Sequence, residues 1–312
     1  MQRFNSKASK LGAFFYSLKI FLQHLNVLTK YKTNTMKYIS IISLLLLLLS
    51  FTNCASKKYK NISYLERTTS DKEKPTLNIF KPRNKKYNNN PVLLFVHGGN
   101  WNSGDKKLYG FFGRNFAKKG ITTVIVGYTL SPKANYDDMA KEVAKAVEWT
   151  KNNIAKYNGN PNAIFLTGHS AGGHLVALVA TNPKYLKDNS IIKGIILNDA
   201  AGLDMKHYLE EYPPTEDADY LTTWTDKPEN WAAASPILFL NKNTPKIMMY
   251  LGSKTYESIK VSNQRFLQAL HPFQPDVKPI ILNKKHIPMI LQYFFPWSNR
   301  FDEIKKFIDE NK

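Results

Sequence analysis

The segment Ala163–His174, with the sequence AIFLTGHSAGGH, limits what this chain can fold into more than any other stretch. Ala163–Leu166 is an apolar run typical of a buried strand, and Leu175–Ala180 is a small, apolar segment typical of a helix. Between them, glycines two residues before and two residues after Ser170 leave room for a strand and a helix to pack around a sharp turn. The pattern predicts a strand, a turn and a helix, with the hydroxyl of Ser170 as a candidate nucleophile. Taken alone, it also suits an ordinary helix start rich in small residues.

A second glycine turn follows an earlier strand-like run. Val92–Val96 is apolar throughout and leads directly into His97–Trp101, which contains two adjacent glycines. Such glycines allow main-chain N–H groups to face a reacting atom without an intervening Cβ, although the same pair also serves simply to end a strand. Acyl transfer requires donors from an early loop of this kind and from the residue after the nucleophile. The oxyanion hole that we predict consists of Gly98, Gly99, Asn100 and Ala171.

The rest of the chain alternates between strand-like and helix-like segments. Ile121–Gly127 and Ile191–Leu197 have the composition of buried strands, and a helix is predicted from about Asp137 to about Tyr157. This alternation predicts an α/β fold with a mostly parallel, doubly wound sheet, whose reactive groups gather at the carboxyl ends of the strands. Leu203–Ser235 is irregular and rich in aromatic residues, so we expect a small lid-like excursion there.

Three motifs, taken in order, carry a family resemblance. His97-Gly98-Gly99-x-Trp101, Tyr128-x-Leu130-Ser131-Pro132 and the glycine-flanked serine up to His174 resemble the α/β-hydrolase fold. More narrowly, they resemble its carboxylesterase branch, which includes hormone-sensitive-lipase-like, feruloyl-esterase-like and kynurenine-formamidase-like enzymes. The resemblance covers about residues 75–310. It implies a serine hydrolase that cleaves a small ester through an acyl-enzyme, with no metal and no organic cofactor.

A serine nucleophile needs an imidazole to accept its proton and a carboxylate to hold that imidazole. The resemblance implies that the base is His286, which follows the strand-like run Val277–Leu282. At the usual position of the acid, three residues after a strand-ending glycine, this chain has Thr255. Asp199 and Glu257 are the two replacements. We favour Asp199, because a charge at the end of an apolar strand costs desolvation energy unless it has a partner.

The amino-terminal region has the features of an export signal. A short basic start at Met36 precedes the apolar run Ile39–Leu49, which is too short to span a bilayer comfortably. Cys54, the single cysteine, follows in a sequence that resembles the lipobox of bacterial lipoproteins, although Asn53 departs from the small residue usual there. The alternative is a plain signal peptide with an incidental thiol. The predicted organisation is 1–35 as an upstream translation, 36–53 as the signal peptide, 54–70 as a lipidated tether and 71–312 as the hydrolase domain.

The net charge of +20 is unevenly distributed along the 312 residues. Residues 1–60 contain ten Lys or Arg and no Asp or Glu, which leaves 34 basic and 24 acidic residues, a net +10, for 61–312. No nucleic-acid-binding module is recognisable, so nucleic acid is not an expected partner. We expect a small ester as substrate and a lipid on Cys54 that attaches an exported bacterial protein to a membrane, in the periplasm or at the outer membrane. The alternatives are a non-catalytic binding lipoprotein with this fold, or a formamidase or peptidase acting on small amides.

Overall fold

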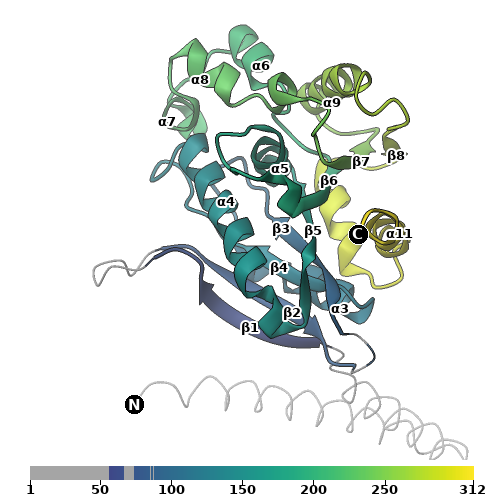
Figure 1. Cartoon of the computed structure of the whole chain (residues 1–312). Coiled ribbons are helices and arrows are strands. Elements are labelled where there is room, and N and C mark those ends of the chain that lie inside the picture. Colours follow the sequence, from purple (N-terminus) through teal and green to yellow (C-terminus); the bar gives the residue numbers. More distant parts are fainter. Residues whose placement is uncertain (1–55, 67–73, 85, 87) are drawn as a thin grey trace, which may run out of the picture. The chain divides into compact units, whose positions relative to one another are not determined.

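The computed structural model describes residues 56–66, 74–84, 86 and 88–312, whose strands form one eight-stranded sheet (Figure 1). The strand order is β1-β2-β4-β3-β5-β6-β7-β8. The pairs β1–β2 and β2–β4 are antiparallel, and the other five pairs are parallel, which confirms the predicted α/β fold. The strands are β1 (Ser56–Ser63), β2 (Thr76–Pro82), β3 (Asn90–Val96), β4 (Thr122–Val126), β5 (Gly159–His169), β6 (Ile192–Asn198), β7 (Lys246–Gly252) and β8 (Ile280–Leu282).

Helices cover both faces of the sheet. Successive residues of a strand point to opposite sides, and apolar residues on both sides form a core on each face. In β3, Leu94 and Val96 belong to a core with α4 and α5, whereas Leu93 and Phe95 belong to a second core with α3 and α11. A strand buried on both faces is apolar at every position, as the sequence of β3 is. The helices are α3 (Gly110–Lys118), α4 (Tyr136–Asn153), α5 (Ala171–Thr181), α6 (Met205–Glu211), α7 (Tyr220–Trp224), α8 (Pro228–Ala233), α9 (Glu257–Leu270), α10 (His286–Leu291) and α11 (Arg300–Asn311).

The carboxyl ends of the parallel strands meet at one edge of the sheet. Val96 at the end of β3 lies beside Gly168 of β5, and His169 lies beside Asn198 at the end of β6. The ends of β7 and β8 continue this line. The glycine loop, the serine turn, Asp199 and the segment before α10 all follow these strand ends, so the register gathers the predicted site residues at this edge.

The prediction of a tether over residues 54–70 is wrong for Ser56–Ser63, which forms the edge strand β1. Tyr59 and Ile62 pack against the core, and Tyr64, just beyond the strand, is buried. Lysines at neighbouring positions hid the apolar pattern, and charged side chains are common on edge strands because they discourage pairing with another chain. The folded domain therefore includes Ser56–Ser63 and does not begin at residue 71.

Two other segments differ from the predicted pattern. The strand predicted over Val277–Leu282 is shorter, Ile280–Leu282, and His286 begins helix α10 and does not lie in a loop. The predicted excursion at Leu203–Ser235 is present and contains the short helices α6, α7 and α8, which lie together at the top of the described fold in Figure 1. The excursion supplies one wall of the cavity described below.

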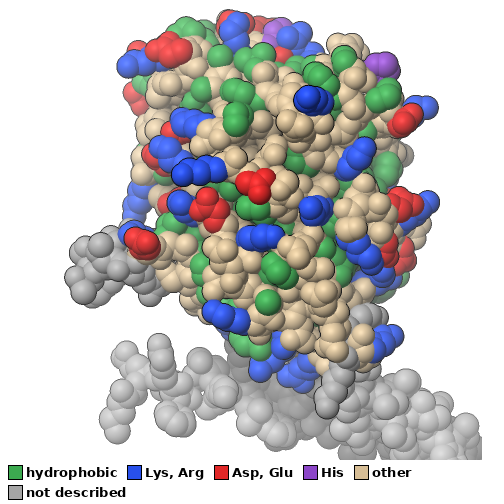
Figure 2. All heavy atoms as spheres, viewed as in Figure 1, with side chains coloured by type: hydrophobic (Ala, Val, Ile, Leu, Met, Phe, Trp, Pro, Cys, Tyr) green, Lys and Arg blue, Asp and Glu red, His purple; other side chains and the backbone are tan. Residues whose placement is uncertain are grey.

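The predicted upstream segment at 1–35, the signal peptide at 36–53 and the lipidation site Cys54 all lie outside the described residues. Over the described ranges, no helix is both long enough and apolar enough to cross a membrane. Figure 2 shows Lys and Arg side chains spread over the face drawn, with Asp and Glu among them. This distribution fits a generally basic surface better than a charged groove for nucleic acid.

Candidate active site

Ser170 lies on the sharp turn between β5 and α5, as predicted. Its backbone angles are φ 55° and ψ −126°, a conformation that residues other than glycine rarely adopt and that stores strain at functional sites. A Cβ on Gly168 would lie 2.2 Å from the carbonyl oxygen of Gly172, and a Cβ on Gly172 would lie 2.1 Å from that of Val96. These contacts explain physically why both flanking positions are glycine: the turn fits against β3 only without side chains there.

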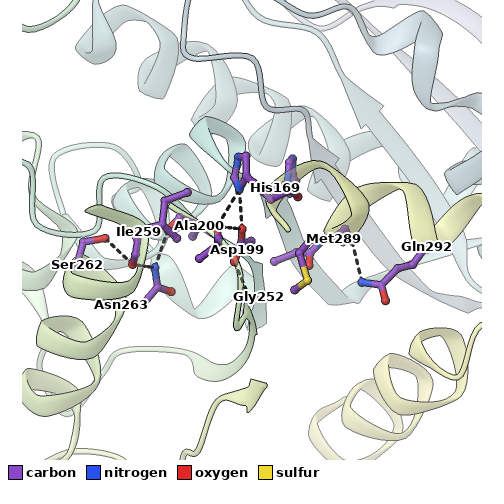
Figure 3. A network of polar contacts seen from close by, with 12 residues as sticks. His169, Asp199, Ala200, Gly252, Ile259, Ser262, Asn263, Met289 and Gln292 are labelled. Carbon is purple, nitrogen blue, oxygen red and sulfur yellow. Dashed lines mark hydrogen bonds and ion pairs between the residues drawn. The ribbon is translucent and has the colours of Figure 1, made fainter. Parts of the chain in front are cut away.

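Asp199, directly after β6, is fully buried and contacts the imidazole of His286. Its Oδ2 accepts a hydrogen bond from Nδ1 of His286 at 2.5 Å. Its Oδ1 accepts one from the backbone N–H of Gly252 at 2.8 Å, and Figure 3 labels Asp199 and Gly252. Thr255 donates its hydroxyl to Oδ2, also at 2.5 Å. These donors offset the several kcal/mol that burial of an unpaired carboxylate costs. Because Nδ1 donates, Nε2 of neutral His286 is left as an acceptor.

Thr255 therefore supports the acid, although it occupies the position where the resemblance implied an acid itself. Glu257, the other candidate, is the first residue of α9; its side chain is 76% exposed and pairs with Lys260 at 3.1 Å. The structure brings Asp199 to His286 and leaves Glu257 in solvent. The sequence indicates only that Thr255 carries no charge, because its role as a donor depends on a contact with a residue 56 positions away.

The predicted oxyanion loop packs directly against the serine turn. A Cβ on Gly98 would lie 2.7 Å from the carbonyl oxygen of His169, so only glycine allows this approach, and the loop turns through left-handed conformations at Gly99 (φ 131°) and Asn100 (φ 50°). Within the described residues, no hydrogen bond uses the N–H groups of Gly99 and Asn100. Ala171 begins α5, and the first N–H groups of a helix have no acceptor inside it. These donors are available to bind an anion.

His174, one turn into α5, connects the oxyanion loop to the excursion. Its Nδ1 accepts a hydrogen bond from the indole N–H of Trp101 at 3.2 Å, and its Nε2–H donates to the carbonyl oxygen of Ala234 at 2.7 Å. Burial lowers the pKa of His174 to about 4, so both nitrogens keep these roles at neutral pH. The excursion contacts the same loop a second time, through the hydroxyl of Tyr220, which donates to the side-chain oxygen of Asn100 at 3.0 Å.

His169, next to the serine, holds the candidate base from the other side. Its ring stacks on that of His286 with centroids 4.6 Å apart, and its Nε2–H donates to the backbone carbonyl of His286 at 3.1 Å. Burial lowers the pKa of His169 to about 3, with a further contribution from nearby His286, so His169 is neutral and adds no charge beside the base. The sequence gives no sign of this role, because the contact spans 117 positions.

A cavity of about 730 Å³ contains the candidate residues in its wall. Ser170, His286 and the oxyanion loop face it on one side, and residues of α6, α7, α9 and α10 complete it. Within the described ranges, His169, Asp199 and His286 also form the one group with the donor atoms to hold a metal ion. Their hydrogen bonds to one another and to Thr255 already use the carboxylate of Asp199, which favours proton transfer over metal binding at this place.

The BD-FAE family matches residues 77–268 of the chain. The chain belongs to the BD-FAE family. The matched range includes the oxyanion loop, the serine turn and Asp199, and it ends before His286.

Esterase LipQ of Mycobacterium tuberculosis is 29% identical over 195 residues, which are 58% of this chain and 45% of LipQ. A probable isoprenylcysteine alpha-carbonyl methylesterase of Oryza sativa subsp. japonica is 38% identical over 87 residues, 28% of this chain and 20% of the relative. The chain thus spans about a fifth to a half of these relatives.

Solved structures share the fold of this BD-FAE member. Inhibited esterase B from Lactobacillus rhamnosis superposes with a TM-score of 0.67 at 18% identity, over 88% of this chain and 94% of the other. A truncated carbohydrate esterase from gut microbiota superposes with a TM-score of 0.65 at 21% identity, over 81% and 97% of the two chains. These similarities establish the α/β-hydrolase fold.

The acid can be identified by the reactivity of Ser170 toward a fluorophosphonate probe. We expect Asp199→Asn to slow labelling roughly 10⁴-fold, because an amide holds the imidazole in the wrong tautomer. Thr255→Val removes one hydrogen bond to the carboxylate at nearly constant volume, so labelling should slow roughly tenfold. Glu257→Gln is the matched control and should stay within about twofold of the wild type, since the loss of an exposed surface ion pair such as Glu257–Lys260 has a small effect. A Glu257→Gln effect as large as that of Asp199→Asn would show that the wrong acid was chosen.

The buried His174 makes stability depend on pH. Its folded pKa of about 4 lies below the unfolded value, so between pH 6.5 and 4 the unfolded chain binds a proton that the folded chain does not, and stability falls as the pH falls. We expect His174→Gln to lose about 1.5 kcal/mol less than the wild type between pH 6.5 and pH 5, because the slope rises toward about 1.4 kcal/mol per pH unit as the unfolded histidine becomes protonated. Urea unfolding at the two pH values measures this difference. The contributions of His169 and the carboxyl groups are present in both proteins, so they cancel in the difference. If the wild type and His174→Gln lose the same stability between the two pH values, the assignment is contradicted.

Proposed function

We propose that this BD-FAE member is a serine carboxylesterase that cleaves a small ester through an acyl-enzyme on Ser170. The observation that carries the proposal is one cavity that contains a serine on a strained turn together with His286, whose Nδ1 is held by buried Asp199. Curated relatives that match parts of the chain are named esterases and methylesterases. The alternative of a non-catalytic binding protein rested on Thr255, and the hydrogen bond from Thr255 to Asp199 removes that reason.

In the first half of the proposed reaction, Nε2 of His286 accepts the proton of Ser170 as Oγ attacks the ester carbonyl. Asp199 stabilises the imidazolium that forms. The carbonyl oxygen becomes negative and is bound by the N–H groups of Gly99, Asn100 and Ala171, each of which is placed in advance and worth roughly 10²–10³ in rate. His286 then returns the proton to the alcohol oxygen, and the C–O bond breaks.

In the second half, water enters in place of the alcohol and attacks the acyl group on Ser170. Nε2 of His286 accepts a proton from the water, and the same N–H groups bind the second oxyanion. The proton then returns to Oγ of Ser170 as the acid is released. A cavity of about 730 Å³ is the size that proteins use for small-molecule ligands, which fits an ester of modest size as the substrate.

Removal of the nucleophile tests the proposal. Ser170→Ala should lower the turnover of p-nitrophenyl acetate by roughly 10⁶-fold, because the attack of Oγ is the step that every other group assists. The variant should unfold at the same urea concentration as the wild type or a higher one, since alanine removes no buried hydrogen bond that the described structure assigns to Oγ. Turnover that survives in Ser170→Ala, or a folded wild type without any hydrolysis and without fluorophosphonate labelling, would refute the esterase.

We also propose that the chain is exported and carries a lipid on Cys54, which attaches it to a bacterial membrane in the periplasm or at the outer membrane. The sequence Phe51–Ser56 around the cysteine supports this, as does the apolar run Ile39–Leu49 before it. Processing should be blocked by globomycin and by Cys54→Ser, because both prevent cleavage before a lipidated cysteine. If globomycin and Cys54→Ser both leave processing and the incorporation of tritiated palmitate unchanged, lipidation is contradicted.

A further inference from the structure

An exposed apolar surface borders the mouth of the cavity. Among the large hydrophobic side chains of the described residues, Trp297 is the most exposed, at 76%, and Leu108 (68%) and Phe294 (60%) are close behind. Scattered apolar side chains are normal on a soluble protein, but a group gathered in one place marks an interaction site. We call this surface the apolar rim, and it consists of Leu108, Ile287, Leu291, Phe294, Phe295 and Trp297.

Ring contacts make the rim continuous with the cavity. Phe111 lines the cavity and lies 5.5 Å from Phe294, measured between ring centroids. Phe294 lies 5.8 Å from Phe295, and Phe295 lies 5.4 Å from Trp297. The three aliphatic members of the rim line the cavity themselves. An apolar path therefore runs from the wall near Ser170 to the outer surface.

The rim is flanked by positive charge. Residues 284–300 include Lys284, Lys285 and Arg300 and contain no Asp or Glu, and residues 106–119 include five Lys or Arg and no acid. Some of these cations pair with acids of α11. Within the part of the chain that the structure describes, Lys284 and Lys285 enter no ion pair, so their charges are available to a partner.

Aromatic and aliphatic side chains bordered by lysine and arginine have the composition of surfaces that enter the headgroup region of a bilayer. Lysines near such a surface are attracted by anionic headgroups. A protein partner fits less well, because protein–protein interfaces are depleted in lysine. We propose that the apolar rim docks on a lipid bilayer that carries anionic headgroups.

Docking in this way would bring the mouth of the cavity against the bilayer. An ester with a long apolar chain would then move along the ring path toward Ser170 without crossing water. This consequence for the substrate rests on the proposed function, whereas docking itself requires no catalysis. The two are therefore tested with different variants.

Trp297 provides a direct measurement in the full-length protein. Three of the five tryptophans are buried, at 0%, 3% and 7% exposure, and Trp149 is half-buried, so Trp297 is the one that a bilayer would reach first. Vesicles of equal parts phosphatidylcholine and phosphatidylglycerol, brominated on the acyl chains, should quench part of the fluorescence. Trp297→Phe keeps an aromatic rim and should lose that part.

Quenching separates the rim from other means of attachment, because the apolar run Ile39–Leu49 would also bring the chain to vesicles. If the protein sediments with vesicles and Trp297 is not quenched, or if it does not bind vesicles, the proposal is overturned. The proposal would also be overturned if the protein is a dimer without lipid and becomes a monomer when Phe294, Phe295 and Trp297 are all changed to serine. The rim would then bind a second copy of the chain. Ser170→Ala should be quenched like the wild type, which keeps this test independent of esterase activity.

Two further variants test the contributions of apolar surface and charge. Phe294→Ser/Phe295→Ser/Trp297→Ser should lower vesicle affinity at least tenfold, and Lys284→Glu/Lys285→Glu should weaken binding to anionic vesicles while leaving the smaller binding to pure phosphatidylcholine unchanged. Phe273→Ser is the matched control, an exposed aromatic residue beyond the end of α9, outside the rim, and it should have no effect. Circular dichroism confirms folding. Equal losses in Phe273→Ser and in the rim variant would overturn the proposal.

Discussion

The buried carboxylate of Asp199 is the group on which the candidate site depends. A charge without water is tolerated in a protein only when donors occupy its oxygens. Here the donors come from the end of β7, from the turn after it and from the first residue of α10, in the form of Gly252, Thr255 and His286. One ionic group thus holds two segments of the last third of the chain, Gly252–Thr255 and the start of α10, at the end of β6.

The sequence predicted those parts of the site that lie on contiguous segments. The serine turn and the glycine loop were recognisable because steric limits act within a few residues, and both loops follow apolar strands whose parallel pairing gathers their ends. Asp199 was favoured over Glu257 by the cost of burying a charge, which a sequence pattern can indicate. The support from Thr255 was not predictable, because it depends on where two loops meet across 56 positions.

Strand β1 and the roles of His169 and His174 were also not predictable from the sequence. β1 has lysines on both sides of its core-facing residue Tyr59, and a strand at the edge of a sheet needs apolar residues on only part of its surface. His169 and His174 flank the serine in sequence, and their partners lie 117, 73 and 60 positions away. Buried neutral imidazoles have no distinctive local pattern, so only the structure assigns them as supports for the base and for the oxyanion loop.

The excursion does more than close the cavity, because it holds the oxyanion loop at two places. Tyr220 donates a hydrogen bond to the side chain of Asn100. Trp101 donates to His174, and His174 donates in turn to the carbonyl oxygen of Ala234. In the esterase that we propose, substrate selection and stabilisation of the reacting oxygen therefore share one set of contacts. In the evolution or redesign of this protein, exchanging the excursion for a relative's would change which substrate enters and, at the same time, how fast the bound substrate reacts.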